Sequence, residues 1–350
     1  MTALTNLQAQ IDGLAARAAA ARSGQGTGAP AVAERALLVD LLLLHGQLLG
    51  RIADYELAAE LAEVMVRDAP DDGTARLARA RARATFHRFT EASADLDAAG
   101  RRGVDRAAMD AERAAILQGA GCYAEARLLR RAEERRCPDF STSGALAVLE
   151  AEQGRVLEAE RLFSEARRRY RGVSPFPVAE LEFRRGLMWM REGDLLAARV
   201  WFDAAVARVP AYAPALGHLA EVDAALGARD AAIDRLRPLT VTSDDPEYAA
   251  TLAGVLRDAG QLQEAEQWRT SAAARYDELV SRHPEAFVDH AAEFWLTVGG
   301  DRRQGRQLAV LSSISRATGA SALLHRVPAS DCWLAGLDTD ERRRSDGRQL

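Results

Sequence analysis

Lysine is absent from this sequence and Asn6 is its only asparagine, so all 46 basic residues are arginine. A GC-rich genome is sufficient to explain that bias. Cysteine is scarce as well, with Cys122, Cys137 and Cys332 the only three. We expect Cys122 and Cys137 at opposite ends of one helix, roughly 22 Å apart at 1.5 Å per residue, which is too far for a disulfide. The cysteines form no disulfide framework, which indicates a reducing compartment.

A basic excess and long apolar runs are also missing. The net charge is −5 and the isoelectric point is near 5.8, so the chain lacks the basic surface typical of nucleic-acid binding. The run from Leu37 to Leu44 is apolar, but it is short and interrupted by Asp40, so no membrane span is predicted. No charged start followed by an apolar core is present, so no signal peptide is evident. We expect a cytoplasmic protein that contacts neither nucleic acid nor membrane.

Helix-forming residues are what the chain has in abundance. Alanine, leucine, arginine and glutamate dominate, and aromatic residues make up only 6%. This composition favours helix throughout, and no strand is predicted. A chain of 350 residues that is 48% hydrophobic could fill two ordinary domains or one long repeat array.

One stretch, from Ala179 to Tyr212, shows how the helices are paired. A helix with a mid-helix glycine, Gly186, ends at the turn Gly193-Asp194, and Asp194 is placed to cap a second helix. That helix carries Ala198 and Phe202 on one face and ends before Pro210. Small residues at Gly186 and Ala198 would let two antiparallel helices approach closely, with Phe202 filling the space beside them.

This stretch resembles the tetratricopeptide repeat (TPR), a 34-residue unit with small residues at positions eight and twenty, an aromatic residue near twenty-four and a proline at thirty-two. Counted from Ala179, those positions hold Gly186, Ala198, Phe202 and Pro210. The alanine of position twenty recurs every 33 or 34 residues, with a single step of 39, at Ala58, Ala92, Ala126, Ala159, Ala198, Ala232 and Ala265. The resemblance implies an all-α solenoid, a right-handed superhelix of seven to eight helix-turn-helix repeats.

The predicted repeats occupy residues 32–305, at 39–72, 73–106, 107–139, 140–178, 179–212, 213–245, 246–285 and a degenerate 286–305. Before them we expect an N-terminal helix over 1–22 and a flexible linker over 23–31. After them we expect an irregular cap over 306–337 and a disordered tail over 338–350. The helix 1–22 carries a heptad stripe, which either covers the end of the solenoid or makes a dimer contact: Leu4, Leu7, Ile11 and Leu14. The 39-residue step places extra residues at 171–178, which form either a binding loop or a surface connection.

Residue patterns for catalysis are missing from the sequence. His290 and Glu293 lie three residues apart, a spacing compatible with two metal ligands, but no third ligand accompanies them. The histidines are scattered, and there is no glycine-rich phosphate loop. The arginine clusters at 127–136 and 167–171 are interleaved with acids and are interpreted as solvated outer faces. We expect no enzyme activity, no metal and no cofactor.

The TPR resemblance implies that positions two, five, nine, twelve and thirteen of each first helix face a concave groove. The candidate groove residues are Gln47, Arg51, Arg81, Phe183, Leu187, Met190, Arg191, Glu221 and Arg257. The resemblance therefore implies a non-enzymatic scaffold or adaptor that binds a partner peptide or helix in this groove. The alternative is a peptide- or ligand-responsive regulator. Chaperone adaptors of this family hold the Hsp70 or Hsp90 tail with lysines and asparagines, and their absence from the repeats argues against that partner.

Overall fold

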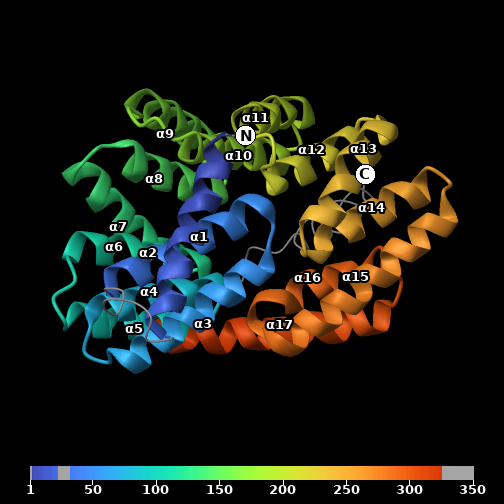
Figure 1. The fold of residues 1–350 in the computed structure, drawn as a ribbon. Coiled ribbons are helices and arrows are strands. Elements are labelled where there is room, and N and C mark those ends of the chain that lie inside the picture. The colour runs from blue at the N-terminus through green and yellow to red at the C-terminus, as the bar shows by residue number, and fades with distance from the viewer. Residues whose placement is uncertain (1, 23–31, 325–350) are drawn as a thin grey trace.

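The computed structural model describes residues 2–22 and 32–324 (Figure 1). All regular secondary structure in this part of the chain is α-helix, in seventeen helices. Helix α1 is followed by eight antiparallel pairs, from α2–α3 to α16–α17. The all-α solenoid predicted from the sequence is confirmed. The linker 23–31, the end of the expected cap and the tail 338–350 lie outside the described residues.

The helices have the following bounds: α1 Thr2–Arg22, α2 Val32–Leu49, α3 Ile52–Asp68, α4 Gly73–Thr85, α5 Phe89–Gly100, α6 Arg106–Gly119, α7 Tyr123–Arg136, α8 Phe140–Glu152, α9 Val156–Arg169, α10 Phe176–Arg191, α11 Leu195–Arg208, α12 Ala213–Ala225, α13 Arg229–Thr242, α14 Pro246–Asp258, α15 Leu262–Arg282, α16 Pro284–Leu296 and α17 Arg302–Leu324.

Small residues hold the two helices of a pair together. The alanines of position twenty are all buried, and in the fifth pair a Cβ added to Gly186 would lie 2.5 Å from Cε1 of Phe202. The turn residue Gly193 has a φ of +78°, a conformation that favours glycine. Asp194 then caps α11 by accepting a 2.9 Å hydrogen bond from the backbone nitrogen of Ala197. Local sequence therefore specifies each pair.

The extra residues of the 39-residue step lengthen a helix as well as a connection. Helix α9 ends at Arg169 and α10 begins at Phe176, so the first turn of α10 takes up part of the insertion. In the connection, the Tyr170 hydroxyl donates to the backbone oxygen of Ser174, and Val173 is fully exposed.

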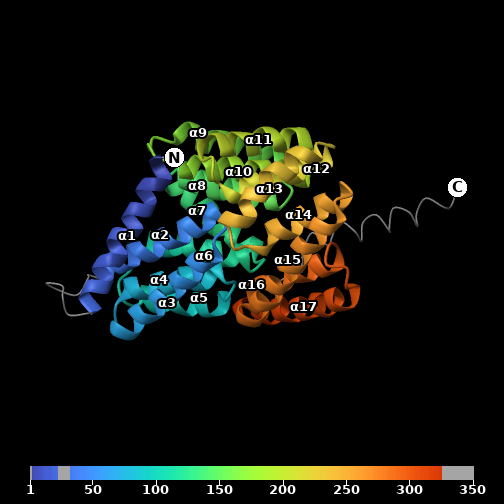
Figure 2. The same cartoon turned by 45° about the vertical axis from the view of Figure 1, so that its right-hand side comes forward.

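Helix α1 runs along the outside of the solenoid (Figure 2). Its heptad residues Leu7, Ile11 and Leu14 are buried in the same hydrophobic core as Val39 and Leu42 of α2. The stripe is thus covered within one chain, as expected for a helix that protects the first repeat.

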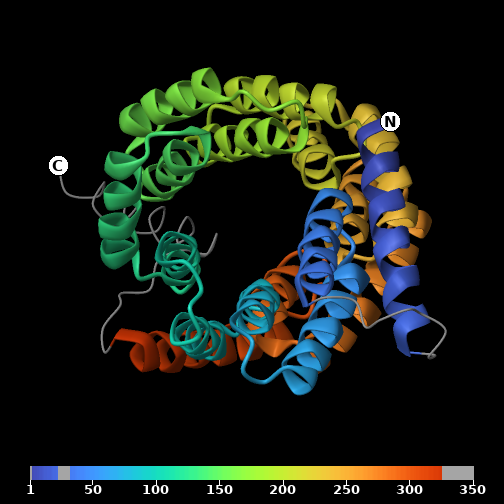
Figure 3. The same ribbon diagram turned by 60° about the vertical axis from the view of Figure 1, so that its left-hand side comes forward.

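The solenoid closes on itself. In Figure 3 the helix pairs follow a ring, in which the first pairs, coloured blue, return beside the yellow and orange helices of the second half. Helix α2 lies against α12, and α5 lies near α17. One hydrophobic core accordingly joins Val39 and Leu42 of the first pair to Phe183 of α10 and Leu219 of α12.

The last pair keeps the packing rule although its sequence departs from the pattern. Gly305 of α17 lies against Leu296 of α16, where an added Cβ would come within 2.7 Å of the Leu296 Cγ. Gly305 therefore allows the close helix contact that an alanine allows in the other pairs. Helix α17 continues to Leu324, over residues for which the sequence suggests an irregular cap.

Candidate binding site at the closure of the ring

The ring closes through polar contacts between the first pair and the sixth to eighth pairs. The carboxylate of Asp244 accepts hydrogen bonds from the backbone nitrogens of Ile52 and Ala53, at 2.6 and 3.1 Å, and so caps the start of α3. Arg275 donates to the same carboxylate at 3.1 Å. Next to it, the Ser243 hydroxyl donates to the backbone oxygen of Gly50. We call this set of contacts the junction.

A second group of contacts closes the ring at the edge of α16. Glu56 of α3 lies 2.8 Å from Arg282 and 2.9 Å from His283. The imidazole of His283 also stacks on Phe86, with ring centroids 4.0 Å apart. Charge pairing and ring stacking thus hold the two ends of the array together.

Tyr248 of α14 fits into the junction because two glycines make room for its ring. An added Cβ would lie 2.8 Å from the Tyr248 Cε2 at Gly50, and 2.7 Å from Cε1 at Gly217 of α12. Gly50 also has a φ of +62°. Tyr248 is only 5% exposed, so its ring closes one side of a space between the first repeat and α12.

That space is a cavity of about 160 Å³ on the inner face of the ring. Helices α2, α3, α10, α12 and α14 and the residues beside them contribute to its wall. The cavity is lined by Gln47, Gly50, Tyr55, Phe183, Arg184, Tyr212, Pro214, Gly217, His218, Glu221, Asp245, Glu247, Tyr248 and Thr251. We call it the junction cavity.

Aromatic rings form much of this wall. Phe183 is 6% exposed, and its ring centroid lies 5.3 Å from that of Tyr212 and 5.6 Å from that of His218. Tyr55 of the first pair and Tyr248 of the seventh pair add two more rings. The aromatic wall is therefore assembled from both ends of the ring.

Two basic residues in the wall are already paired. Arg184 donates from Nε to Oε1 of Glu180 at 2.6 Å, and the Tyr212 hydroxyl donates to the same carboxylate. Nδ1 of His218 lies 2.9 Å from Oε2 of Glu221. Burial alone would lower the pKa of His218, but the charge and hydrogen bond of Glu221, with the charge of Glu247, raise it above its usual value.

Two acids at the start of α14 complete the wall. Asp245 caps α14 by accepting a 3.0 Å hydrogen bond from the backbone nitrogen of Glu247, and burial raises the pKa of its carboxyl. The Glu247 carboxylate makes no hydrogen bond or ion pair within residues 2–22 and 32–324. Burial, with the neighbouring charge of Asp245, raises the pKa of Glu247 to about 7. Glu247 is thus an acid without a partner, poised to ionise near neutral pH.

Comparison with solved structures gives the class of the fold. Neither a protein-family model nor a curated protein sequence matches the chain. The structure is similar to a human IFIT1 dimer with m7Gppp-AAAA, with a TM-score of 0.55, 14% identity, and coverage of 87% of this chain and 77% of that one. It is also similar to a chain of the APC/C hetero-tetramer Cut9–Hcn1, with a TM-score of 0.51, 14% identity, and coverage of 78% of this chain. The match spans 55% of the length of that chain.

A third similar structure is a tetratricopeptide repeat protein from Parabacteroides merdae, with a TM-score of 0.45, 12% identity, and coverage of 79% of this chain and 98% of that one. The eight helix pairs carry small residues at the packing positions that the repeat requires. This packing, repeated over eight helix pairs, gives the chain the fold of a TPR-type repeat protein.

Three of the groove residues predicted from the TPR pattern line the junction cavity. Gln47, Phe183 and Glu221 come from the first, fifth and sixth TPR units, and the closed ring brings them together. Leu187 and Met190 are half-buried and pack against the core that includes Phe183. Leu187 and Met190 do not line the cavity.

The four predicted arginines lie elsewhere. Arg81 bridges neighbouring TPR units, with Nη1 2.9 Å from Asp40 and Nε 2.7 Å from Glu112. Arg51, Arg191 and Arg257 are exposed and do not line the junction cavity. The cavity residues that were not among the predicted groove residues include Tyr55, Arg184, Tyr212, His218, Asp245, Glu247 and Tyr248.

One signal for the missed acids is present in the sequence. Asp245 precedes Pro246 at the first position of a helix, and Glu247 occupies the second position of the seventh TPR unit, which the family pattern directs to the groove. Nothing local marks the tyrosines, because their role depends on segments far apart in the chain.

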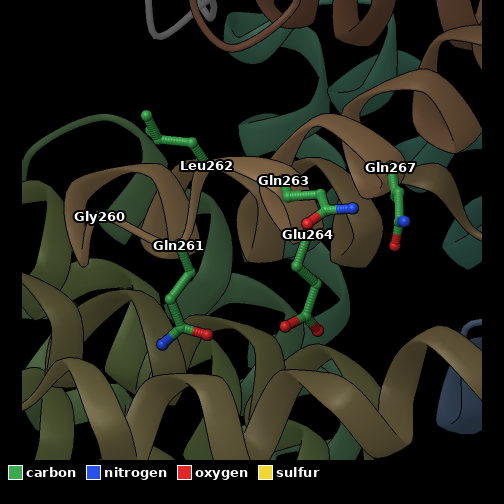
Figure 4. A pocket seen from close by; sticks show the side chains of 6 residues that line it. All are labelled: Gly260, Gln261, Leu262, Gln263, Glu264 and Gln267. Atoms are coloured by element: carbon green, nitrogen blue, oxygen red, sulfur yellow. The ribbon is translucent and has the colours of Figure 1, made fainter.

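A larger hollow, of about 680 Å³, lies at the start of α15 (Figure 4). Gly260, Gln261, Leu262, Gln263, Glu264 and Gln267 line it, so a single short segment provides all of its residues. Figure 4 shows their side chains pointing in different directions, with Leu262 turned away from Glu264. A surface hollow without converging groups is a weaker candidate than the junction cavity.

Within residues 2–22 and 32–324, no three or more His, Cys, Asp or Glu side chains are grouped so that they could hold a metal ion. Among the same residues, no helix combines the length and apolar character needed to cross a membrane.

Proposed function

We propose that this TPR-type protein is a non-enzymatic scaffold that binds a segment of a partner protein along its inner face. The observation that carries the proposal is the convergence of groove positions from four TPR units on one cavity. Gln47, Phe183, Glu221 and Glu247 belong to the first, fifth, sixth and seventh units. A partner segment that reaches this point would contact both ends of the ring at once.

The size of the cavity favours a side chain as its occupant. Small-molecule pockets usually have volumes of about 300–1,000 Å³. The junction cavity, at about 160 Å³, is smaller than this range. We therefore propose that one side chain of the partner enters the cavity, while the rest of the segment follows the inner face in an extended or helical form.

The electrostatics favour a protein partner over RNA. The IFIT1 structures contain the RNA ligands m7Gppp-AAAA and PPP-AAAA. In this chain, Glu221, Asp245 and Glu247 in the cavity wall and a net charge of −5 oppose the binding of RNA. Phosphate groups are held by basic side chains, so these acids would repel them.

A selection of displayed random peptides on the full chain tests the scaffold. Peptides recovered with the wild-type protein should bind at least about tenfold more weakly to Gln47→Arg, because the larger side chain takes up space in the cavity that Gln47 lines. Gln263→Arg is the matched control: it makes the same change in the exposed hollow of Figure 4. The oligonucleotide PPP-AAAA should not bind to either protein.

The proposal fails if the selected peptides bind Gln47→Arg as tightly as wild type. It also fails if Gln263→Arg alone loses them, which would place binding at the outer hollow, or if PPP-AAAA binds and peptides do not.

A further inference from the structure

The charges in the junction cavity do not cancel. Arg184 is paired with Glu180, and His218 is paired with Glu221. Asp245 and Glu247 remain, and no basic side chain of the described residues forms an ion pair with either one. Where these two half-buried acids ionise, the cavity therefore carries negative charge that no basic side chain balances.

Several polar side chains of the wall make no hydrogen bond within residues 2–22 and 32–324, and two of them, Glu247 and Tyr248, are consecutive residues in the first turn of α14. The Tyr248 side chain is 5% exposed, but neither its hydroxyl nor the Glu247 carboxylate is cut off from solvent, so both are open to a ligand in the cavity. A ligand that donates hydrogen bonds would satisfy both groups. Because one of them is a carboxylate, a positively charged donor would form the stronger bond.

The aromatic wall favours the same kind of ligand. Cations are attracted to the faces of tyrosine and phenylalanine rings within about 6 Å. The cavity presents Tyr55, Phe183, Tyr212 and Tyr248. The guanidinium of Arg184 already lies 5.7 Å from the centroid of the Phe183 ring, so the wall already makes one cation–π contact.

We propose that the junction cavity binds the guanidinium or ammonium group of a basic residue, with Glu247 as the acceptor and the tyrosine rings as the surrounding wall. This inference rests on the proposed function, since it names the side chain that the partner segment inserts. We assign the cation to a residue within a peptide. A free small cation is the alternative ligand, and the experiment below distinguishes the two.

Binding of a cation should depend on pH, because it requires ionised Glu247. The charged and titratable groups that face this carboxyl are Arg184 of α10, Tyr55 of α3, His218 and Glu221 of α12, Asp245 before α14, Arg275 and Tyr276 of α15, and His290 and Glu293 of α16. Acid would protonate both Glu247 and His218, and each change reduces the attraction for a cation. With a Glu247 pKa of about 7, affinity should rise about tenfold from pH 6 to pH 8.

The test uses the full chain with 13C-methyl-labelled threonine, because Thr251 lines the cavity and reports on its occupancy. Three probes are titrated: the acetylated amide of Ala-Ala-Arg-Ala-Ala, the same peptide with uncharged citrulline in place of arginine, and Nα-acetylarginine amide. The arginine peptide should shift the Thr251 methyl signal and should bind more tightly than either other probe.

Glu247→Gln removes the charge and should weaken the arginine peptide at least about tenfold. Glu285→Gln is the matched control: Glu285 also follows a proline in the first turn of a first helix, but it is exposed on α16 and lies outside the cavity. A thermal melt of each variant establishes that it is folded.

The possible results separate the two proposals. Equal binding of the arginine and citrulline peptides, or full binding to Glu247→Gln, would overturn the cation site while leaving a peptide groove. Equal binding of Nα-acetylarginine amide and the arginine peptide would leave a cation site but overturn its assignment to a peptide. No shift of Thr251 with any probe would overturn the inference, and the displayed-peptide selection would then decide the proposed function by itself.

Discussion

The carboxylate of Asp244 accepts a 2.6 Å hydrogen bond from the backbone nitrogen of Ile52, which lies 192 residues earlier in the chain. Helix α3 has no cap of its own, since the side chain of Arg51 makes no capping hydrogen bond. A helix of the first TPR unit is therefore capped by the connection between the sixth and the seventh. Contacts between units so distant are unusual in repeat arrays, where each unit mainly contacts its neighbours.

Replacing this cap should open the ring. Asp244→Ala should destabilise the protein by about 1–2 kcal/mol, because α3 loses its cap and Arg275 loses one of its two carboxylate partners. It should also increase the radius of gyration in small-angle scattering. Asp194→Ala removes a cap within one pair, so it should lower stability by a similar amount with no change in scattering. An unchanged radius for Asp244→Ala would contradict the closed ring.

Filling the space beside Tyr248 should also destabilise the junction. In Gly217→Ala the new Cβ would lie 2.7 Å from Cε1 of Tyr248, so the ring must move, at a cost of about 1–3 kcal/mol. At Gly254 of α14 the nearest atom, Cγ2 of Val298, is 3.4 Å away. Gly254→Ala should therefore leave stability unchanged or raise it by up to about 1 kcal/mol, because alanine favours helix. Urea unfolding of both variants measures the difference.

Glu247 should make the protein less stable as the pH rises. Its pKa is about 7 in the folded protein against 4.5 as an isolated group, so the folded state binds the extra proton between these values. The contribution of Glu247 to the free energy of unfolding is therefore fully present below pH 4.5, and it is lost as the pH rises toward 7. Glu247→Gln should be more stable than wild type at pH 8, by about 1–3 kcal/mol, and equal to it near pH 4.5. Thermal melts from pH 4.5 to 8 should show no such pattern for Glu285→Gln.

Glu150 should behave in the opposite way. It is fully buried on α8, and it accepts hydrogen bonds from Arg127, at 2.8 Å, and from Arg155. Burial alone would raise the pKa of Glu150, but these two arginines hold it below its usual value, so its contribution is present at neutral pH and is lost as the pH falls below 4.5.

Glu150→Gln should consequently cost about 3–5 kcal/mol at pH 7, because two arginines lose a buried partner. The nearby pair Glu158 and Arg161 is largely exposed, so Glu158→Gln should cost less than about 1 kcal/mol. Chemical unfolding at pH 7 compares the two, and equal losses would show that Glu150 is not the central acceptor of its arginines.

The sequence allowed the helix pairs to be predicted because each pair depends on nearby residues. Ala198 and Gly186 lie in one unit, and the turn at Gly193 follows directly, so the period alone placed them. The groove positions Gln47, Phe183 and Glu221 were also predictable, since the TPR pattern assigns them individually. That these three residues lie in one cavity could not be predicted.

Closure depends on the small rotation between successive units, added over the whole array. The total rotation cannot be predicted from any local pattern in the sequence. Tyr248 and Glu247 look like ordinary residues at the start of a helix, and only the return of α2 to α12 gives them a shared cavity. Arg51, Arg191 and Arg257, at positions twelve and thirteen of their units, are exposed and lie outside this cavity.

The bond between Asp244 and Ile52 also sets the number of TPR units. An open solenoid can gain or lose a unit, because each new interface repeats an existing one. In a closed ring, a 34-residue insertion between α9 and α10 would carry Asp244 past the start of α3, and a deletion would leave it short. Duplication of a unit, the ordinary way in which repeat proteins change length, would therefore break this molecule at the place where its binding cavity is formed.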